Sequence, residues 1–338
     1  MLYVNTLNAG RTIYHGYKNA FIDLAHEFYT VTADDDFART LDKVCPDIFM
    51  TGLGHYNLRY MDLLALKKHR LRGMKVFVNM PFWTSPIKRV NESASLKNDD
   101  LLVNLIKNDK LGDFYYNVCE PDDPRMEGFE QATGYSHITI PLAADKLTLK
   151  GQYLQKYNAD ISFIGTYLPE KRPFFKRIIF PLQSKYRLRL YGQDWTLWDR
   201  VLGIVQKCGQ YYNFPILKDI RKLRMNLGDE ANIYASSIIS INVHEEYQRR
   251  FGGDCNERTF KIPLCNGFEI TDDVRCIRKY FQEGDEIIIA KDDRDFLEKL
   301  EYYLRNPEQR KKIVQRGSDR VLSEHTYHNR IAELLNLL

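Results

Sequence analysis

The stretch NERTFKIPLCNGFEITDD, residues 256–273, predicts a short helix followed at once by a buried strand. The helix is expected near Thr259–Cys265, because Asn266–Gly267 is a common helix stop, and the apolar run from Phe268 is typical of a strand. A further apolar run, SSIISINV at 236–243, lies before this helix and also predicts a strand. Strand, helix and strand in this order form a parallel βαβ unit, so the sequence predicts an α/β domain here.

The same alternation extends in both directions along the 338 residues, a length that predicts about two domains. Strands that are apolar on both faces favour parallel sheets covered on both sides, so we expect two doubly wound, Rossmann-like domains facing a cleft. A polar stretch at 145–160 is the expected linker, which gives domains at 1–150 and 151–320. The expected strands are 2–5, 47–53, 74–80, 114–119, 137–143, 161–167, 186–192, 236–243, 268–272 and 286–290. The expected helices are 17–28, 58–69, 101–107, 126–132, 172–183, 216–225, 259–265, 294–304, 307–318 and 323–338.

The composition is that of an ordinary globular protein, with 44% hydrophobic and 28% charged residues, which excludes disordered and collagen-like classes. Six cysteines without a CxxC pair indicate reduced thiols rather than a disulfide framework or a structural zinc site. No export signal and no run of 18 apolar residues occur, so we expect a cytoplasmic protein.

The net charge of +4 conceals a basic middle, since residues 151–226 carry 14 basic and 5 acidic side chains. A solvated face is the simplest interpretation. A nucleic-acid groove is an alternative, although no RNP, zinc or helix-turn-helix signature accompanies these charges. A third hypothesis is that the apolar and basic segment from Val201 to Met225 rests on an anionic membrane, which would make the protein peripheral to the inner face of that membrane.

The segment FIGTYLPEKR, residues 163–172, is the first candidate phosphate site. An apolar strand ends at Gly165, where a glycine permits close backbone approach, and the loop leads to Lys171 and Arg172 at a helix start. Paired cations beside helix N–H groups suit a phosphate or diphosphate. The alternative is a strand-ending glycine with two solvated cations, and the segment is no Walker A loop.

Arg258 and Thr259 form the second candidate, at the start of the helix predicted within 256–273. The backbone dipole favours an anion there, and an arginine adds bidentate contacts to phosphate. The alternative is that Arg258 only pairs with a surface carboxylate.

Taken in order, several segments resemble the C-terminal half of GT-B glycosyltransferases of the group-1 type, within these most similar to the spore-maturation-protein family. HITIPLAADK at 137–146 resembles the last strand before the linker of that family, and the first half is otherwise less similar. The matching segments are DISFIGTYLPEKR (160–172), RLRLYGQDW (187–195), ANIYASSIISINVH (231–244), NERTFKIPLCNGFEITDD (256–273), GDEIIIAKD (284–292) and the tail 302–330.

The resemblance implies a nucleotide diphosphate-sugar donor bound by the second domain, no metal ion and no other cofactor, and a final helix, 321–338, that packs back on the first domain. Many retaining relatives have a glutamate where this chain has Lys261, so ribose recognition is expected to pass to Glu257 or Glu269. The implied donor-binding residues are Gly165, Tyr167, Lys171, Arg172, Gly192, Asn242, His244, Glu257, Arg258, Thr259 and Lys261.

An inverting enzyme needs a general base for the acceptor hydroxyl, whereas in front-face retention the leaving phosphate takes the proton. His15, His55 and Glu120 are the candidate catalytic residues, because each follows or ends a predicted strand of the first domain. For each of them taken alone, a loop or capping residue is the preferred interpretation over the base, and our preference is retention.

Other acidic and histidine residues are expected to be structural or exposed. Asp34–Asp36 has the DxD spacing of a metal site, but we interpret it as a solvated acidic turn. We expect His69, His325 and His328 at the surface, because they lie on charged helical stretches.

The predicted function is therefore metal-independent transfer of a sugar from a nucleotide diphosphate to a glycan, glycolipid or surface-polysaccharide precursor, with no nucleic-acid partner. The alternatives are a nucleotide-sugar epimerase of the same fold, and a non-catalytic protein that binds sugar nucleotides or nucleic acid.

Overall fold

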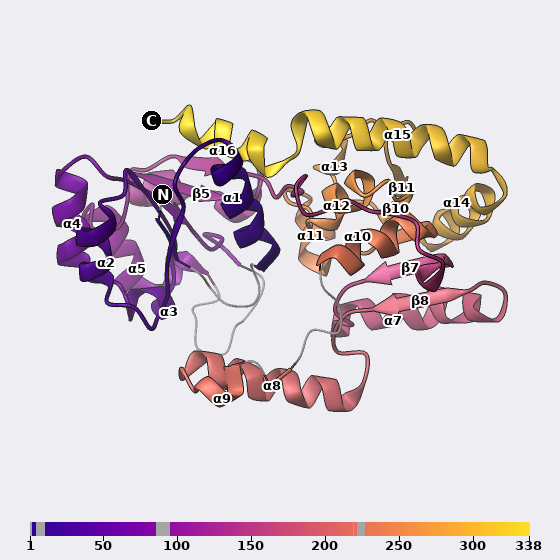
Figure 1. Cartoon of the computed structure of the whole chain (residues 1–338), viewed down its shortest axis with the longest axis horizontal. Helices are drawn as coiled ribbons and strands as arrows, with labels where there is room; N and C mark the ends of the chain where they lie inside the picture. The colour runs from indigo at the N-terminus through magenta and orange to yellow at the C-terminus, as the bar shows by residue number, and fades with distance from the viewer. Residues whose placement is uncertain (1, 5–10, 86–94, 219, 222–226) are drawn as a thin grey trace. The chain divides into compact units, whose positions relative to one another are not determined.

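The computed structural model describes residues 2–4, 11–85, 95–218, 220–221 and 227–338 (Figure 1). The chain divides into two compact units, Met1–Pro141 with His328–Leu338, and Leu142–Tyr327. Each unit contains one parallel sheet with helices, so the predicted α/β fold class is confirmed. The division falls at Leu142, compared with the predicted 150, and the chain returns to the first unit at His328, compared with the predicted 321.

The first unit has a six-stranded sheet in the order β2-β1-β3-β4-β5-β6. Neighbouring strands are parallel throughout, and β3 and β4 pair from Ile48 opposite Lys75 to Gly52 opposite Asn79. Its strands are β1 (Leu2–Val4), β2 (Tyr29–Val31), β3 (Ile48–Gly52), β4 (Lys75–Asn79), β5 (Phe114–Asn117) and β6 (His137–Thr139). Its helices are α1 (Arg11–Asp23), α2 (Phe37–Val44), α3 (His55–Leu58), α4 (Leu63–Leu71), α5 (Asp100–Lys107) and α6 (Phe129–Thr133), and all but the first residue of α16 (Tyr327–Leu335) also belong to this unit.

The second unit has a five-stranded parallel sheet in the order β11-β10-β9-β7-β8. The chain passes from β7 to β8 on one side and then to β9 on the other, which makes β7 and β9 the point where the strand order reverses. Its strands are β7 (Ala159–Ile164), β8 (Leu188–Tyr191), β9 (Ser237–Asn242), β10 (Glu269–Asp272) and β11 (Ile288–Ala290). Its helices are α7 (Arg172–Phe174), α8 (Leu197–Tyr211), α9 (Pro215–Lys218), α10 (Leu227–Ser236), α11 (Glu246–Phe251), α12 (Arg258–Leu264), α13 (Ile277–Tyr280), α14 (Asp293–Arg305) and α15 (Pro307–Glu324).

Both faces of the second sheet are buried, as the continuous apolar runs predict. Ile287 and Ile289 pack in one apolar cluster with Phe260 and Val321, whereas Ile288 packs in the other with Phe296. Successive side chains of a strand point to opposite faces, so this alternation places one hydrophobic core on each side of the sheet.

Several predicted helix and strand bounds are wrong for local reasons. The helix predicted at 58–69 is two helices, because Asp62 caps α4 by accepting from Leu64 N and Ala65 N. The helix predicted at 172–183 is a turn of α7, a π-helical turn at Phe175–Ile179 and a 3-10 turn at Phe180–Ser184. The sequence analysis missed β2, which has only three residues, and the strand predicted at 137–143 ends at Thr139.

Two other expectations differ from the structure. The predicted linker belongs to the second unit, where Leu149 is buried and a Cβ on Gly151 would lie 2.7 Å from the carbonyl oxygens of Ala231 and Cys265. The helix predicted at 216–225 contains α9, and its residues 219 and 222–225 lie outside the described part of the chain.

The prediction that three histidines are exposed is wrong, since all three are buried. His69 bonds to Asp42 across two helices, and His325 bonds to the carbonyl oxygen of Tyr280. Both occupy the inner sides of helices whose outer sides carry the charges. No helix in the described residues is long and apolar enough to span a membrane.

Candidate functional site

The site is built at the carboxyl ends of β7 and β9, where ligands of open parallel sheets bind because the strand order reverses there. Gly165 follows β7 directly, and its backbone N–H donates to Tyr191 O at the end of β8. Gly192 continues β8 with a φ of +111°, and a Cβ on it would lie 2.3 Å from Gly165 O. Glycine is therefore required at 192 for the two loops to approach this closely.

Lys171 ends the loop after Gly165, and its side chain is 97% buried. Burial, and then the neighbouring Arg258, lower the pKa of Lys171 to about 7 against the opposing effect of Glu245 and Asp272. Among the described residues no hydrogen bond or ion pair engages its ammonium group. A buried cation without a carboxylate partner is a group that an anionic ligand would stabilise.

Arg258 opens α12 and is held in place by its own unit. Its Nε donates to Asn242 Oδ1 (3.0 Å) and its Nη2 donates to Val243 O (3.2 Å). Its Nη1 has no partner in the described chain and would lie 3.2 Å from a Cβ on Gly165, so it faces the turn after β7. The backbone N–H of Arg258 donates to Asn256 Oδ1 (3.0 Å). An anion would therefore be bound by the guanidinium group of Arg258 and not by its backbone amide.

Asn242 lies beneath this arginine and uses all of its hydrogen-bonding capacity within the protein. Its amide nitrogen donates to Thr259 Oγ1 (3.2 Å) and Glu269 Oε1 (2.8 Å), and its oxygen accepts from Asn256 (2.9 Å) and Arg258. The structure thus assigns it a positioning role, because no donor or acceptor of the side chain is left for a ligand.

His244 is fully buried and bonded through both ring nitrogens. Its Nδ1 lies 2.6 Å from Asp272 Oδ1, and its Nε2 lies 3.2 Å from Thr259 Oγ1. Burial raises the pKa of Asp272, but the histidine outweighs this effect and the pKa lies below its usual value. The ionised Asp272 accepts from Nδ1–H, and the Thr259 hydroxyl lies within hydrogen-bonding distance of Nε2, so both ring nitrogens are engaged within the unit. The chain from Asn242 through Thr259 to Asp272 fixes the start of α12.

Arg172 and Tyr167 form the outer part of the same loop. The Arg172 guanidinium lies 5.4 Å from the Tyr167 ring centroid, and the Tyr167 ring stacks on Trp195 at 4.6 Å. The buried Nε of Arg172 has no hydrogen-bond partner. Tyr167 is thus part of the aromatic core, and its ring packs against the guanidinium group of Arg172.

Lys261, where many relatives have a glutamate, is buried between two carboxylates. Its Nζ lies 3.2 Å from Glu257 Oε2 and 3.4 Å from Glu230 Oε1. Burial lowers the pKa of Lys261, but the two glutamates outweigh burial and the net shift is upward. Glu257 also accepts from Tyr327 Oη (2.6 Å). Glu230 lies 31 residues from Lys261, and the sequence analysis did not identify it.

Glu269 is buried beneath Asn242, and its Oε2 has no hydrogen-bond partner among the residues that the structure describes. Burial raises its pKa to about 8, against the opposing effects of the Asn242 hydrogen bond and of Arg258. At neutral pH the folded protein therefore holds a proton on Glu269 that the unfolded chain releases. Stability must fall as pH rises from the ordinary glutamate pKa of 4.5 to about 8, and level off above it.

The change Glu269→Gln is expected to remove this pH dependence, because glutamine is neutral at every pH. Each unit of pKa shift corresponds to about 1.4 kcal/mol, so we expect the wild type to lose about 5 °C or more relative to the variant between pH 5 and 8. Thermal unfolding across that range is the measurement, with Glu298→Gln on exposed α14 as the matched control. An equal difference in melting temperature at pH 5 and pH 8 would contradict the assignment.

The three candidate catalytic residues all lie in the first unit. His15 is in the second turn of α1, with its ring against Tyr14, and Glu120 is buried beyond the end of β5. His55 opens α3 after β3, its side chain is 42% exposed, and its Nε2 lies 2.6 Å from Asp99 Oδ2. His55 thus combines a partly exposed ring with a carboxylate that orients it.

The acidic turn predicted at Asp34–Asp36 is built from local hydrogen bonds. Asp35 accepts from the backbone and hydroxyl of Thr32, and Asp36 caps α2 by accepting from Arg39 N. The described residues contain no group of three or more His, Cys, Asp or Glu side chains that could hold a metal ion.

Two doubly wound parallel units, with cations at the strand-order reversal of the second, define a protein of the GT-B glycosyltransferase fold. Residues 172–336 match the family described as "Glycosyl transferase-like". Spore protein CgeB of Bacillus subtilis (strain 168) is 22% identical over 220 residues, which cover 61% of this chain and 63% of that protein.

Solved structures with the same fold cover nearly the whole chain. A glycosyltransferase from Rickettsia africae has a TM-score of 0.62 at 11% identity, over 99% of this chain and 96% of its own. Sucrose-phosphate synthase from Thermosynechococcus elongatus has a TM-score of 0.60 at 9% identity, over 99% and 97%. Anabaena Alr3699/HepE in complex with UDP and glucose has a TM-score of 0.59 at 12% identity, over 100% and 99%. The predicted resemblance is confirmed, and the family match with these neighbours supports a glycosyltransferase enzyme.

Proposed function

We propose that the protein transfers a sugar from a nucleotide diphosphate to a glycan, a glycolipid or a surface-polysaccharide precursor, without a metal ion. The observation that carries the proposal is the pair of cations at the end of β7, Lys171 and Arg258, whose ammonium and Nη1 have no partner among the described residues. An anion stabilises two like charges that lie this close in a buried site, and a diphosphate is an anion of the right kind.

The same cations account for the chemistry that the transfer needs. When the bond between the sugar and the diphosphate breaks, negative charge develops on the leaving phosphate, and preorganised cations stabilise it most. Lys171 and Arg258 are held by the fold, so no reorganisation is needed at that step. Arg172, with its buried and unbonded Nε, extends the positive charge along the loop.

We propose retention of the anomeric configuration, because the leaving diphosphate can then take the acceptor proton and no base is required of the protein. The inverting alternative would assign the base to His55, since Asp99 orients its ring. Whether the reaction retains or inverts the anomeric configuration, Asn242, His244 and Thr259 act as positioning residues for Arg258.

For the nucleoside, we propose that Glu257 replaces the glutamate that Lys261 displaces. One carboxylate oxygen of Glu257 pairs with Lys261 and the other accepts from Tyr327, and these two contacts fix the carboxylate at the start of α12. The neutral Glu269 beneath Asn242 is the less suitable candidate, because a ribose hydroxyl is held best by a charged carboxylate.

A thermal-shift screen with UDP, GDP, CDP and dTDP sugars tests donor binding. One nucleotide is expected to raise the melting temperature by about 5 °C at a saturating concentration, because a ligand that binds only the folded state stabilises it. HepE was crystallised with UDP-glucose, so UDP-glucose is the first sugar nucleotide to test. The matching nucleoside monophosphate, which lacks the second phosphate, is the control and should give a much smaller shift.

Donor turnover in excess EDTA then tests metal independence, and analysis of the released sugar separates transfer or hydrolysis from epimerisation. Stabilisation by RNA or DNA with no response to any sugar nucleotide would instead favour a nucleic-acid-binding protein.

A further inference from the structure

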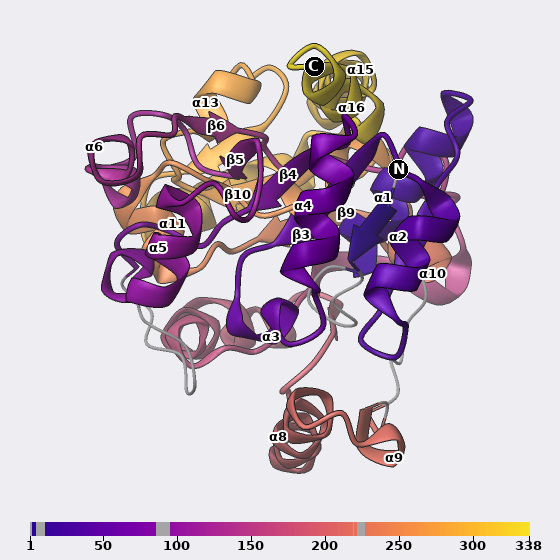
Figure 2. The same ribbon diagram turned by 90° about the vertical axis from the view of Figure 1, so that its left-hand side faces the viewer.

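The helices α8 and α9 form a pair that stands to one side of the β7–β11 sheet within their unit (Figures 1 and 2). Several of their large apolar side chains are exposed. Ile204 is 65% exposed, Trp198 is 70% exposed and Ile216 is 89% exposed. We call the exposed apolar set the hairpin face, which consists of Leu197, Trp198, Val201 and Ile204 of α8 together with Tyr212, Phe214 and Ile216.

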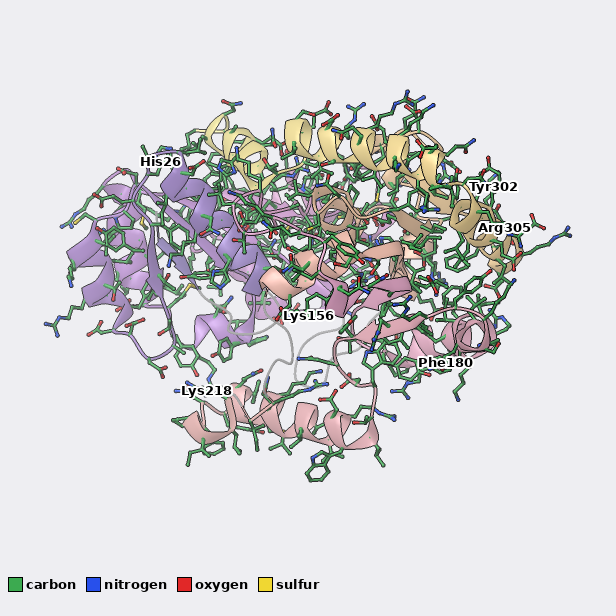
Figure 3. All side chains as sticks on the ribbon, turned by 45° about the vertical axis from the view of Figure 1, so that its right-hand side comes forward. His26, Lys156, Phe180, Lys218, Tyr302 and Arg305 are labelled. Carbon is green, nitrogen blue, oxygen red and sulfur yellow. The ribbon has the colours of Figure 1, made fainter. Side chains whose placement is uncertain are left out.

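The spacing of these residues shows that the exposure follows from helix geometry. Leu197, Val201 and Ile204 recur at intervals of four and three residues, which places them along one side of α8. Figure 3 shows side chains projecting from α8 and α9, with Lys218 at the α9 end. The apolar stripe therefore points away from the contacts that hold the pair together.

Those contacts lie on the opposite side of α8 and do not use the hairpin face. Arg221 is 8% exposed and binds Asp194 (2.6 Å) and Asp199 (2.8 Å), and its N–H donates to Gln206. A Cβ on Gly209 would lie 2.4 Å from Leu217 Cβ, so the two helices pack closely there. These contacts between the two helices are made by polar and small residues, and the side chains of the hairpin face remain exposed.

The charges around the hairpin face are mostly positive. Between Leu197 and Lys218 the only acidic residue is Asp199, and Arg221 pairs with it. The basic residues of this range are Arg200, Lys207 and Lys218. An apolar stripe bordered by cations, with tryptophan and tyrosine among its residues, has the composition of a helix that lies in a membrane interface.

We propose that the hairpin face docks on a membrane surface that contains anionic lipids. The apolar side chains enter the boundary between headgroups and acyl chains, and Arg200 and Lys207 contact the lipid phosphates. A second copy of the chain fits this surface less well, because it would bring the same cations together without a carboxylate to pair them. Docking goes beyond the proposed transfer reaction. Only its consequence, access to a lipid-linked acceptor, rests on that proposal.

Cosedimentation of the full-length protein with vesicles tests the docking. The wild type is expected to bind phosphatidylcholine vesicles containing phosphatidylglycerol at low salt, and to bind pure phosphatidylcholine vesicles less. Ile204→Glu and Ile216→Glu should each lower vesicle affinity by about tenfold or more, because each places a charge where an apolar side chain is buried. Leu64→Glu on α4, at an equally exposed apolar position (81%), is the matched control and should bind like the wild type.

Tryptophan fluorescence provides a second measurement that locates the contact. Of the three tryptophans, Trp83 is buried and Trp195 stacks on Tyr167, so a blue shift on adding vesicles is expected to come from Trp198. Trp198→Phe should abolish the shift while vesicle binding persists. A shift that survives in this variant would place the contact elsewhere and overturn the proposal.

Donor-induced thermal shift in the same preparations separates the two proposals. If the wild type responds to its sugar nucleotide but does not bind anionic vesicles, docking is wrong and the proposed function stands. If the wild type is a dimer that Ile204→Glu converts to a monomer, and neither form binds vesicles, the hairpin face joins two copies and the membrane assignment is overturned.

Discussion

Replacing Arg258 with alanine is expected to lower kcat/KM for donor turnover by about 10²- to 10³-fold, the loss typical of a preorganised donor to a developing negative charge. The guanidinium is oriented by Asn242 and Val243, and its free Nη1 faces the turn at Gly165. Release of the nucleoside diphosphate from the sugar donor is the measurement. Arg258→Lys keeps the charge but loses the fixed fork of donors, so its turnover should lie between those of the alanine variant and the wild type.

Arg294→Ala is the matched control, because Arg294 is an exposed arginine of the same unit that pairs only with a nearby surface glutamate. Its turnover should equal that of the wild type. The melting temperature of Arg258→Ala must be measured as well, since this arginine also bonds within its unit. Unchanged turnover in a folded Arg258→Ala protein would remove this residue from the donor site.

The second large effect is a loss of donor affinity as pH rises above 7. Lys171 has a pKa of about 7 in the free protein, because it is buried beside Arg258. A bound diphosphate favours the ammonium form, so the pKa must rise on binding and a proton is taken up. Affinity for a nucleotide sugar, whose diphosphate keeps a constant charge in this range, should therefore fall by up to about tenfold per pH unit between pH 7 and 9.

Isothermal titration with UDP-glucose at pH 7, 8 and 9, in buffers of different ionisation enthalpy, measures both the affinity and the proton uptake. Lys171→Met should bind about 10- to 100-fold more weakly at pH 7 and show no pH dependence, because the titrating charge is gone. Lys171→Arg keeps its charge throughout this range and should also be independent of pH. A flat profile for the wild type would show that this ammonium does not contact the donor.

The strands that could be predicted from the sequence are those buried on both faces. Runs such as SSIISINV and EIIIA are continuously apolar because helices cover both sides of the sheet, and β9 and β11 lie within them. The strand β2 has three residues and only one of them is buried, so it leaves no such pattern. The irregular helix after Lys171 contains Pro173 and Pro181, which mark where regular hydrogen bonding fails, but the packing of Phe175 and Ile179 sets its course.

The candidate donor site was predictable in its cations and not in its partners. A glycine after an apolar strand, followed by Lys171 and Arg172, is a local pattern, and so is Arg258 at a helix start. The partners of His244 and Lys261 are Asp272 and Glu230, which lie 28 and 31 residues away along the chain. No local pattern connects these residues, because the ends of β9 and β10 in one case, and the helices α10 and α12 in the other, come together only when the unit folds.

The sequence by itself determined two parallel α/β units, the cations near the ends of two strands, and a basic, apolar segment in the middle of the chain. Only the tertiary structure decided which polar groups are bonded within the protein, such as Asn242, and which have no partner in the part of the chain that the structure describes, namely the ammonium of Lys171 and one nitrogen of Arg258. It also decided that Ile204 and Ile216 face outward. The physical reason is that the spacing of apolar residues along a helix or strand indicates only which side of that segment is buried. Whether a buried charge is compensated depends on groups that only the folded chain brings within hydrogen-bonding distance.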